Sequence, residues 1–418
     1  MQGKISTATQ NKLSINYGAV IIGITILLNF ASMSFFYSYG VFLKPLAEEL
    51  GSSRTQASLP LMIFLFSMSF SAPFIGGLLD KYPIRRIIMT ATSVMSVGLI
   101  LLSQIQSHLQ LYLIVSLFIG ISIQGVGALA TNKLLTNWFY RYRGLALGAS
   151  AIGLSFAAML MPILSAGLIA SFGWRTSYGI FGLAIFLIVV PLVAYLVFTR
   201  PEDKGLIKDF NQQSVNMTAA DTEPLGINYS SRDILLSANF WKIIIVMGIP
   251  SGVLTAMVTH VVPYLSDIGF SDLQAATLFS TIGISALFGK VFWGWLIDRF
   301  DARIAILFAL AIQAGGIWQF LISASYWQFT FASVVYGLGM ASIPSFQGVL
   351  VAKAFGNTSF GKVFGYTLPG MLPFTLGLIY FSAAVYDHLS SYDIAFYTFI
   401  GLFLFAALVT ARLKLYKT

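Results

Sequence analysis

The sequence has little charge and no cysteine. Charged residues make up 9% of the 418 residues, whereas roughly a quarter of a soluble domain is charged, so the chain is not a water-soluble globule. The absence of cysteine excludes disulfides, thiolate metal sites and cysteine nucleophiles. The three histidines are far apart, and the sequence contains neither an HExxH nor a GxSxG motif. We therefore expect a protein that is not an enzyme and that uses no metal or cofactor.

Long apolar runs take the place of charge, since 57% of the residues are hydrophobic. A helix that spans a membrane needs about 20 apolar residues, and the first run is too long to be the core of a signal peptide. The pattern predicts an all-α membrane protein with twelve transmembrane helices in two six-helix bundles. The twelve runs cover approximately 17–43, 56–79, 87–105, 109–136, 144–171, 177–198, 240–266, 272–297, 303–323, 328–352, 361–384 and 392–411.

One long polar segment divides these runs six and six. Its low hydrophobicity, turn-forming residues and mixed charge are typical of a flexible linker. The expected organisation is a cytoplasmic tail (1–16), a first bundle (17–198), a cytoplasmic linker (199–239), a second bundle (240–411) and a second tail (412–418).

The distribution of basic residues predicts the orientation. With both termini in the cytoplasm, most of the 24 Lys and Arg residues fall on the inner side, and only Lys44, Arg54 and Arg175 fall outside. The net charge of +9 therefore reflects the topology of a multi-pass protein in a lipid bilayer and requires no nucleic acid. Every acidic residue lies in a loop, in the linker or at a helix end. No carboxylate is thus expected beside Lys290, which interrupts an apolar run, unless a kink brings Asp267 towards it.

Two corners between predicted helices repeat one pattern, GGLLDKYPIRR and WGWLIDRFDAR. In each, a glycine allows close helix approach, and a carboxylate and an arginine can pair where the helix leaves the lipid. We interpret the pattern as a conformational latch, with a plain topology signal and helix-end capping as the alternative. The residues that match are Gly76, Asp80 and Arg85 in the first corner and Gly294, Asp298 and Arg303 in the second.

The repeated corner, with twelve spans split six and six, resembles the major facilitator superfamily. Three further stretches resemble the bacterial branch of the monocarboxylate transporter family, which also contains oxalate:formate exchangers. They are SYGVFLKPLAEELG (38–51), NWFYRYRGLALG (137–148) and HVVPYLSDIG (260–269). The resemblance implies a transporter of the bacterial inner membrane, functional as a monomer. It also implies a substrate site between the two halves that opens to each side in turn.

The resemblance also implies roles for individual residues. Lys290 matches the anion-binding cation on the eighth helix, where relatives usually carry arginine. His260 and Asp267 match a pattern on the seventh helix, and in some members this aspartate takes part in proton coupling. The eleventh helix lacks the second cation of oxalate exchangers, which disfavours a dicarboxylate. Ala286 and Ala128 stand where relatives often have an acidic residue and a tyrosine.

Lys290 is unusual even without the resemblance. It precedes Asp298 by eight residues, or roughly 12 Å of helix, which is too far for easy snorkelling to the interface. A lysine at such depth costs roughly 2.5–3.5 kcal/mol and usually faces a cavity or a pathway. The alternative is a lysine bonded to backbone carbonyls of a neighbouring helix. Lys133, close to a predicted helix end, is expected to snorkel to the cytoplasm.

His260 suits proton exchange or a hydrogen bond to a carboxylate, with a core histidine as the alternative. Asp267 is a candidate for proton coupling, with an exposed helix end as the alternative. Weaker candidates for substrate contact are polar residues inside apolar spans, which also commonly hold helices together. They are Tyr37, Gln124, Asn132 and Tyr366, and Tyr39 and Gln347 are of the same kind.

The sequence thus predicts a secondary active transporter of a small organic anion. A monocarboxylate moved with protons fits best, with Lys290 neutralising the carboxylate and His260 as the proton-sensitive neighbour. One alternative is anion exchange. Another is a transporter or exporter of neutral or bulky solutes in which Lys290 is structural. A receptor that only binds has little support, because the two corners indicate halves that move. GISALFGKV lacks the spacing of a phosphate-binding loop, so a gradient and not ATP is expected to drive transport.

Overall fold

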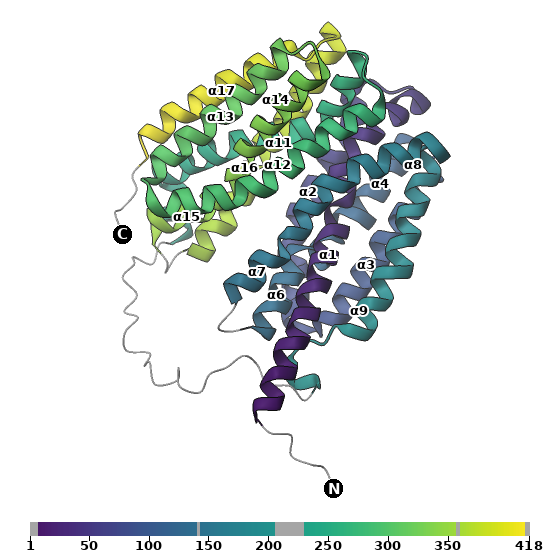
Figure 1. The fold of residues 1–418 in the computed structure, drawn as a ribbon, viewed down its shortest axis with the longest axis vertical. Helices are drawn as coiled ribbons and strands as arrows, with labels where there is room; N and C mark the ends of the chain where they lie inside the picture. Colours follow the sequence, from purple (N-terminus) through teal and green to yellow (C-terminus); the bar gives the residue numbers. More distant parts are fainter. Residues whose placement is uncertain (1–6, 140–142, 205–229, 357–359, 414–418) are drawn as a thin grey trace. The chain divides into compact units, whose positions relative to one another are not determined.

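The computed structural model describes residues 7–139, 143–204, 230–356 and 360–413. Within these residues every regular element is a helix, and none is a β-strand (Figure 1). Helices satisfy all their backbone hydrogen bonds internally, as a lipid environment requires. The all-α prediction is confirmed.

The first half of the chain opens with long helices and then breaks into shorter ones. The fourth apolar run contains a π-helical stretch, and Gly127 interrupts it with non-helical backbone angles (φ −87°, ψ −147°). The elements are α1 (Thr7–Leu50), α2 (Arg54–Lys81), α3 (Ile84–Leu102), α4 (His108–Ile114), η1 (Val115–Gly120), α5 (Ile123–Val126), α6 (Ala128–Trp138), α7 (Arg143–Ser150), α8 (Ile152–Ala184), η2 (Ile185–Val189), α9 (Val190–Leu196) and η3 (Pro201–Lys204).

The helices of the second half are more regular. Capping boxes formed by Ser271 with Gln274 and by Ser325 with Gln328 fix the starts of α12 and α14, because each pair satisfies two orphan donors of the first helical turn. The elements are α10 (Ser231–Leu236), α11 (Ala238–Asp267), α12 (Asp272–Arg299), α13 (Ala302–Ile322), α14 (Tyr326–Met340), α15 (Ser342–Phe355), α16 (Phe360–Leu389) and α17 (Asp393–Ala411).

The number of membrane passes agrees with the prediction. In the described part of the chain, 11 helical segments are long and apolar enough to cross a membrane, and one of them runs for 52 residues from Leu145 to Leu196. Gly173 breaks that segment with φ 77° and ψ 162°, a left-handed conformation that glycine adopts without strain. One pass therefore lies on each side of Gly173, so this segment supplies two passes and the described residues contain twelve.

The predicted segment limits differ from the helices in two places. Helix α1 begins at Thr7, well before the apolar run that starts at residue 17, so part of the predicted N-terminal tail is helical. The middle of the predicted linker, 205–229, lies outside the described residues, and its ends form η3 and α10.

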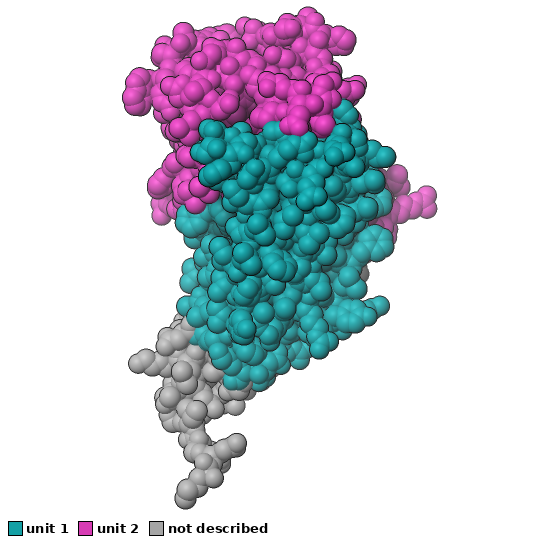
Figure 2. Space-filling view, turned by 90° about the vertical axis from the view of Figure 1, so that its right-hand side faces the viewer, with its two compact units in different colours: residues 1–37, 63–157, 167–221 teal, residues 38–62, 158–166, 222–418 magenta. Residues whose placement is uncertain are grey.

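By its internal contacts the chain forms two compact units (Figure 2). Unit 1 comprises residues 1–37, 63–157 and 167–221. Unit 2 comprises residues 38–62, 158–166 and 222–418. The C-terminal end of α1, from Ser38, and the start of α2 thus belong to the same unit as α11 to α17, although the sequence places them in the first six-helix bundle.

Two glycines show how these first-half segments fit into unit 2. A Cβ atom built on Gly40 would lie 2.5 Å from the carbonyl oxygen of Val258, so α1 meets α11 backbone to backbone. A Cβ on Gly283 would lie 2.7 Å from the carbonyl carbon of Ala158, so α12 meets α8 in the same way. Small residues of this kind allow membrane helices to approach closely.

Candidate functional site

Lys290 lies within α12, between a buried face and an exposed face of the helix. Gly283 and Ala286 share its face at helical spacing, and both are buried. On the adjoining face the indole Nε1 of Trp293 donates a 2.7 Å hydrogen bond to the carbonyl oxygen of Leu338 and anchors α12 to α14. Lys290 itself is half-buried. Its ammonium group is therefore partly removed from solvent, and its role in binding an anion stays a prediction.

His260 is buried on α11, where both of its ring nitrogens are used. Nε2 lies 3.2 Å from the carbonyl oxygen of Ile379, and Nδ1 lies 3.3 Å from the hydroxyl of Tyr392. These partners fit a neutral ring whose Nε2–H donates to the carbonyl while the tyrosine hydroxyl donates to Nδ1. In this conformation the surroundings are those of a histidine satisfied in the core. Its role in proton or substrate contact stays a prediction.

Asp267, at the end of α11, pairs with two cations from the first half of the chain. Its Oδ1 lies 2.7 Å from Nζ of Lys44, and Nη2 of Arg54 lies 3.0 Å from its Oδ2. The two basic side chains belong to the ends of α1 and α2 that are part of unit 2. The carboxylate is consequently paired, although Asp267 as a residue is exposed at the helix end, which was its alternative. A role in proton coupling stays a prediction.

A second aspartate, Asp387 on α16, binds the start of α2, where Arg54 lies. It accepts hydrogen bonds from the backbone N–H groups of Arg54 (2.8 Å) and Thr55 (2.9 Å), the first two residues of α2. The guanidinium of Arg54 also lies 4.8 Å from the ring centre of Tyr386. We call Lys44, Arg54, Asp267 and Asp387 the clamp.

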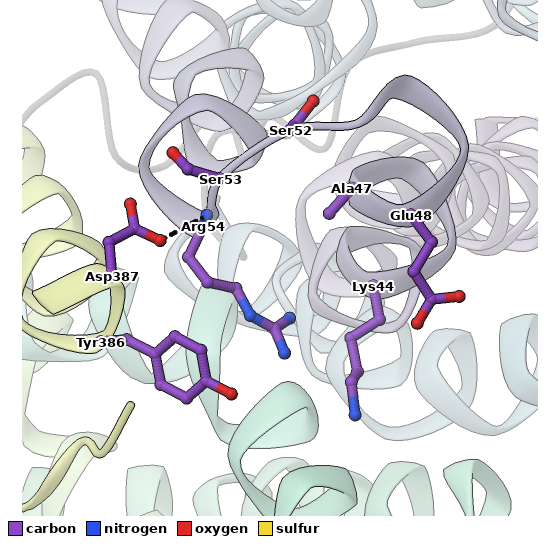
Figure 3. A pocket seen from close by; sticks show the side chains of 8 residues that line it. All are labelled: Lys44, Ala47, Glu48, Ser52, Ser53, Arg54, Tyr386 and Asp387. Atoms are coloured by element: carbon purple, nitrogen blue, oxygen red, sulfur yellow. Dashed lines mark hydrogen bonds between the residues drawn. The ribbon is translucent and has the colours of Figure 1, made fainter. Parts of the chain in front are cut away.

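A cavity of about 300 Å³ opens beside the clamp (Figure 3). Figure 3 shows Arg54 between Tyr386 and Lys44, with its backbone bonded to Asp387. Sequence reasoning counted Lys44 and Arg54 only as outside charges and gave Asp387 no role. The sequence did contain a signal for this cluster, because few charged residues are predicted on the outer side of the membrane and they include both acidic and basic ones. The lining residues are Lys44, Ala47, Glu48, Ser52, Ser53, Arg54, Tyr386 and Asp387.

The first corner motif forms contacts other than those the sequence suggested. Asp80 pairs with Lys133 of α6, the lysine that was expected only to snorkel. Arg85 instead donates to the carbonyl oxygen of Ala194 and lies 5.8 Å from the ring centre of Phe198. The Asp–Arg pair expected within this corner is thus not among the contacts of Asp80 in the described residues.

The glycines of both corners do not bring helices together in this conformation, because a Cβ built on Gly76 or Gly294 would meet no atom within 4 Å. In the second corner the backbone N–H of Arg303 donates to Asp301, and the side chain of Asp298 lies outside the described part of the structure. A latch at these corners stays a prediction.

The weaker candidates have varied surroundings. Gln124 donates a 3.0 Å hydrogen bond to the carbonyl oxygen of Met68, which is the helix-joining role that was its alternative. Tyr37 is half-buried against Phe36, with ring centres 5.0 Å apart. Within their own units, Asn132 is exposed and Tyr366 is half-buried. Two other polar residues are also bonded inside unit 2, where Tyr39 donates to the carbonyl oxygen of Ala57 and Gln347 donates to Thr367.

The sequence model of the Major Facilitator Superfamily matches residues 25–366 and 244–417. The chain belongs to the major facilitator superfamily. The fold agrees, because a bacterial homolog of the human lysosomal transporter Spinster, solved in an inward-facing and unoccupied conformation, superposes with a TM-score of 0.75. That comparison covers 94% of this chain and 96% of the other at 15% identity, and it shows the fold alone.

Curated relatives in the superfamily carry different solutes. Monocarboxylate transporter 13 of Rattus norvegicus is 25% identical over 67% of this chain and 61% of its own length. The sialic acid transporter NanX of Escherichia coli is 24% identical over 63% and 60%. The agnestins efflux protein AgnL12 of Paecilomyces divaricatus is 25% identical over 71% and 64%. The chain thus spans about three fifths of the length of the curated relatives it matches. It is a multi-pass integral membrane protein of this superfamily, whose matched relatives are transporters and not enzymes.

Proposed function

We propose that this major facilitator carries a small organic anion, a monocarboxylate, together with protons. It would act as a monomer in a bacterial inner membrane with both termini in the cytoplasm. The observation that carries the proposal is Lys290, a half-buried cation about 13 Å from the nearer end of α12 at 1.5 Å per residue. The similarity to monocarboxylate transporters supports the same substrate class.

In this mechanism the ammonium of Lys290 neutralises the substrate carboxylate while the two halves rock around it. A monocarboxylate and a proton that cross together move no net charge. The cycle then avoids the cost of moving charge against the membrane potential, about 2.3 kcal/mol per elementary charge per 100 mV. A gradient of protons or of substrate supplies the driving force.

His260 and Asp267 are the residues proposed to couple the proton. Each already has partners, so a proton would have to displace an existing contact. A charged His260 has two N–H donors, which obliges the Tyr392 hydroxyl to turn and accept. A neutral Asp267 weakens its attraction for Lys44 and Arg54. Proton uptake at either residue is therefore tied to a change in packing.

Anion exchange is the second candidate, and the same contacts favour it. An exchanger uses Lys290 for each anion in turn and needs no titrating group, which suits a chain whose His260 and Asp267 are both bonded. A transporter of neutral or bulky solutes, with Lys290 structural, is the third, and the similarity to an efflux protein supports it.

The test is uptake of radiolabelled small acids and neutral solutes into proteoliposomes, with and without an inward proton gradient. We compare the wild type with Lys290→Gln and Lys290→Arg. Uptake of a monocarboxylate that the gradient accelerates, that Gln abolishes and that Arg retains supports the proposal. Uptake that depends on internal counter-anion and ignores the gradient supports exchange. Equal movement of neutral solutes by the wild type and the Gln variant overturns the anion site.

A further inference from the structure

The clamp joins both halves of the sequence at a single turn, and we propose that it is the latch that closes the outer side of the transporter. The outer side is defined by the proposed orientation, in which Lys44 and Arg54 are extracellular. The latch is separate from Lys290, and it acts on access to the site and not on substrate recognition.

One arm of the latch holds the start of α2 through its backbone. The first N–H groups of a helix have no partner within the helix, and the helix dipole makes that end positive. Ser53 and Gln56 form a local capping box there, with the Ser53 hydroxyl accepting from the backbone of Gln56 and the Gln56 side chain accepting from the backbone of Ser53. This box does not reach the N–H groups of Arg54 and Thr55. Asp387 accepts from both of them.

Asp387 is thus a helix cap supplied from far along the chain. When α16 separates from α2, both N–H groups lose a charged acceptor and need water instead. The arm is indifferent to the identity of the side chain at position 54, because it binds only the backbone of Arg54. Its strength can therefore be varied independently of the other arm.

The other arm holds α11 through the side chains of Arg54 and Lys44. Both pair with Asp267, and Arg54 also lies over Tyr386. The backbone of Arg54 binds Asp387 of α16, as Figure 3 shows, while its guanidinium binds Asp267 of α11. This residue therefore ties α2 to α11 and α16 at once. The arm is released only when two cations lose their shared carboxylate.

The setting of the clamp makes it reversible. Its side chains are partly accessible, with 11% exposure for Arg54, 21% for Asp267 and 24% for Lys44, and a cavity lies beside them. Water can therefore solvate these groups as the clamp opens, and such partly exposed ion pairs are individually weak. A latch of this kind biases an equilibrium between states without locking one of them.

The test uses the absence of cysteine, because a single introduced thiol is then the only site of maleimide labelling. Val262→Cys places it on α11, one turn beyond Val258 and 3% exposed. We measure its labelling from outside by a membrane-impermeant maleimide, in the background of Arg54→Gln and, separately, Asp387→Asn. Each variant is expected to raise the labelling rate by up to about fivefold, the factor that corresponds to about 1 kcal/mol.

Glu48→Gln is the matched control. Glu48 lines the same cavity, and Glu48→Gln removes one negative charge, as Asp387→Asn does. In the described part of the structure no ion pair or hydrogen bond of the Glu48 side chain is seen. Its labelling rate should equal that of the parent. Because Arg54 takes part in both arms, the double variant Arg54→Gln/Asp387→Asn should raise the rate above either single variant, and its departure from the product of the two single effects measures the coupling between the arms.

Equal labelling rates in Arg54→Gln, Asp387→Asn and Glu48→Gln overturn the latch. If Asp387→Asn fails to fold, as shown by size-exclusion profiles, Asp387→Glu and Arg54→Lys keep the charges and should give smaller increases than the full removals. Labelling needs no substrate, so a wrong substrate class leaves this result unchanged. Labelling only from the linker side would instead overturn the proposed orientation.

Discussion

Gly40→Ala adds one methyl group where α1 meets α11 backbone to backbone. The new Cβ would lie 2.5 Å from the carbonyl oxygen of Val258 and 3.1 Å from that of Thr259. Ordinary contact begins at 3.4 Å, so the two helices must separate locally by about 0.9 Å. The neighbouring atoms are backbone atoms of a helix that is buried along most of its length, and they cannot turn aside as a side chain would.

The energetic cost can be assigned to one state. Overpacking of this kind costs about 1–3 kcal/mol. The cost applies only in the closed conformation, in which α1 and α11 are in contact along the seam between them. The better helix propensity of alanine, worth up to about 1 kcal/mol, acts in the closed and the open state alike and cancels from the conformational equilibrium. The open population should therefore rise by roughly 5–150-fold.

The assay is labelling of Val262→Cys from outside in the Gly40→Ala background, together with thermal unfolding in detergent. Gly23→Ala is the control, because Gly23 lies on the same helix and a Cβ there meets nothing within 4 Å. We expect faster labelling with Gly40→Ala alone. Identical labelling in the two alanine variants would show that the seam does not open during the cycle, and it would refute the reasoning.

Three further changes have defined expectations. Lys290→Gln should abolish saturable uptake of the acid and Lys290→Arg should retain it, as measured by KM and maximal rate in proteoliposomes. Tyr392→Phe removes the hydroxyl 3.3 Å from Nδ1 of His260 and should lower the free energy of unfolding by about 1 kcal/mol, and an unchanged melting temperature would contradict that bond. Lys133 and Asp80 are 39% and 68% exposed, so a double-mutant cycle of Lys133→Gln and Asp80→Asn should give a coupling energy below about 1 kcal/mol.

Apolar run length was sufficient to predict the helices, because lipid leaves the backbone few alternatives. The end of the fifth run, predicted near residue 171, agrees with the break at Gly173. The division of the fourth run at Gly127 was not predictable. There a Cβ would lie 2.9 Å from the hydroxyl oxygen of Ser32, so the break depends on a neighbouring helix and not on local sequence.

The site was predictable only in part. Lys290 stands out because a cation is costly inside an apolar run, whereas His260 and Asp267 were singled out by their resemblance to a family pattern. The roles of all three residues stay predictions. Their partners come from distant helices, and no local pattern announces that Tyr392 reaches His260 or that Arg54 reaches Asp267. Asp80 in the first corner, in unit 1, is a further example. Local spacing favoured Arg85 as its partner, but its partner in the structure is Lys133 on another helix.

Asp267 cannot serve as a latch partner and hold a transported proton at the same moment. In the closed clamp a neutral Asp267 would leave Lys44 and Arg54 without the carboxylate they share. A symporter would then have to keep its proton elsewhere during closure, and His260, seven residues away on α11, is the other proposed group.

Asp267→Asn distinguishes the two roles when uptake is measured with and without a proton gradient. If Asp267 only latches, this variant should behave like Arg54→Gln, with faster outside labelling and uptake that the gradient still accelerates. If Asp267 carries the proton, Asp267→Asn alone should lose the acceleration, and the assignment of coupling to His260 fails.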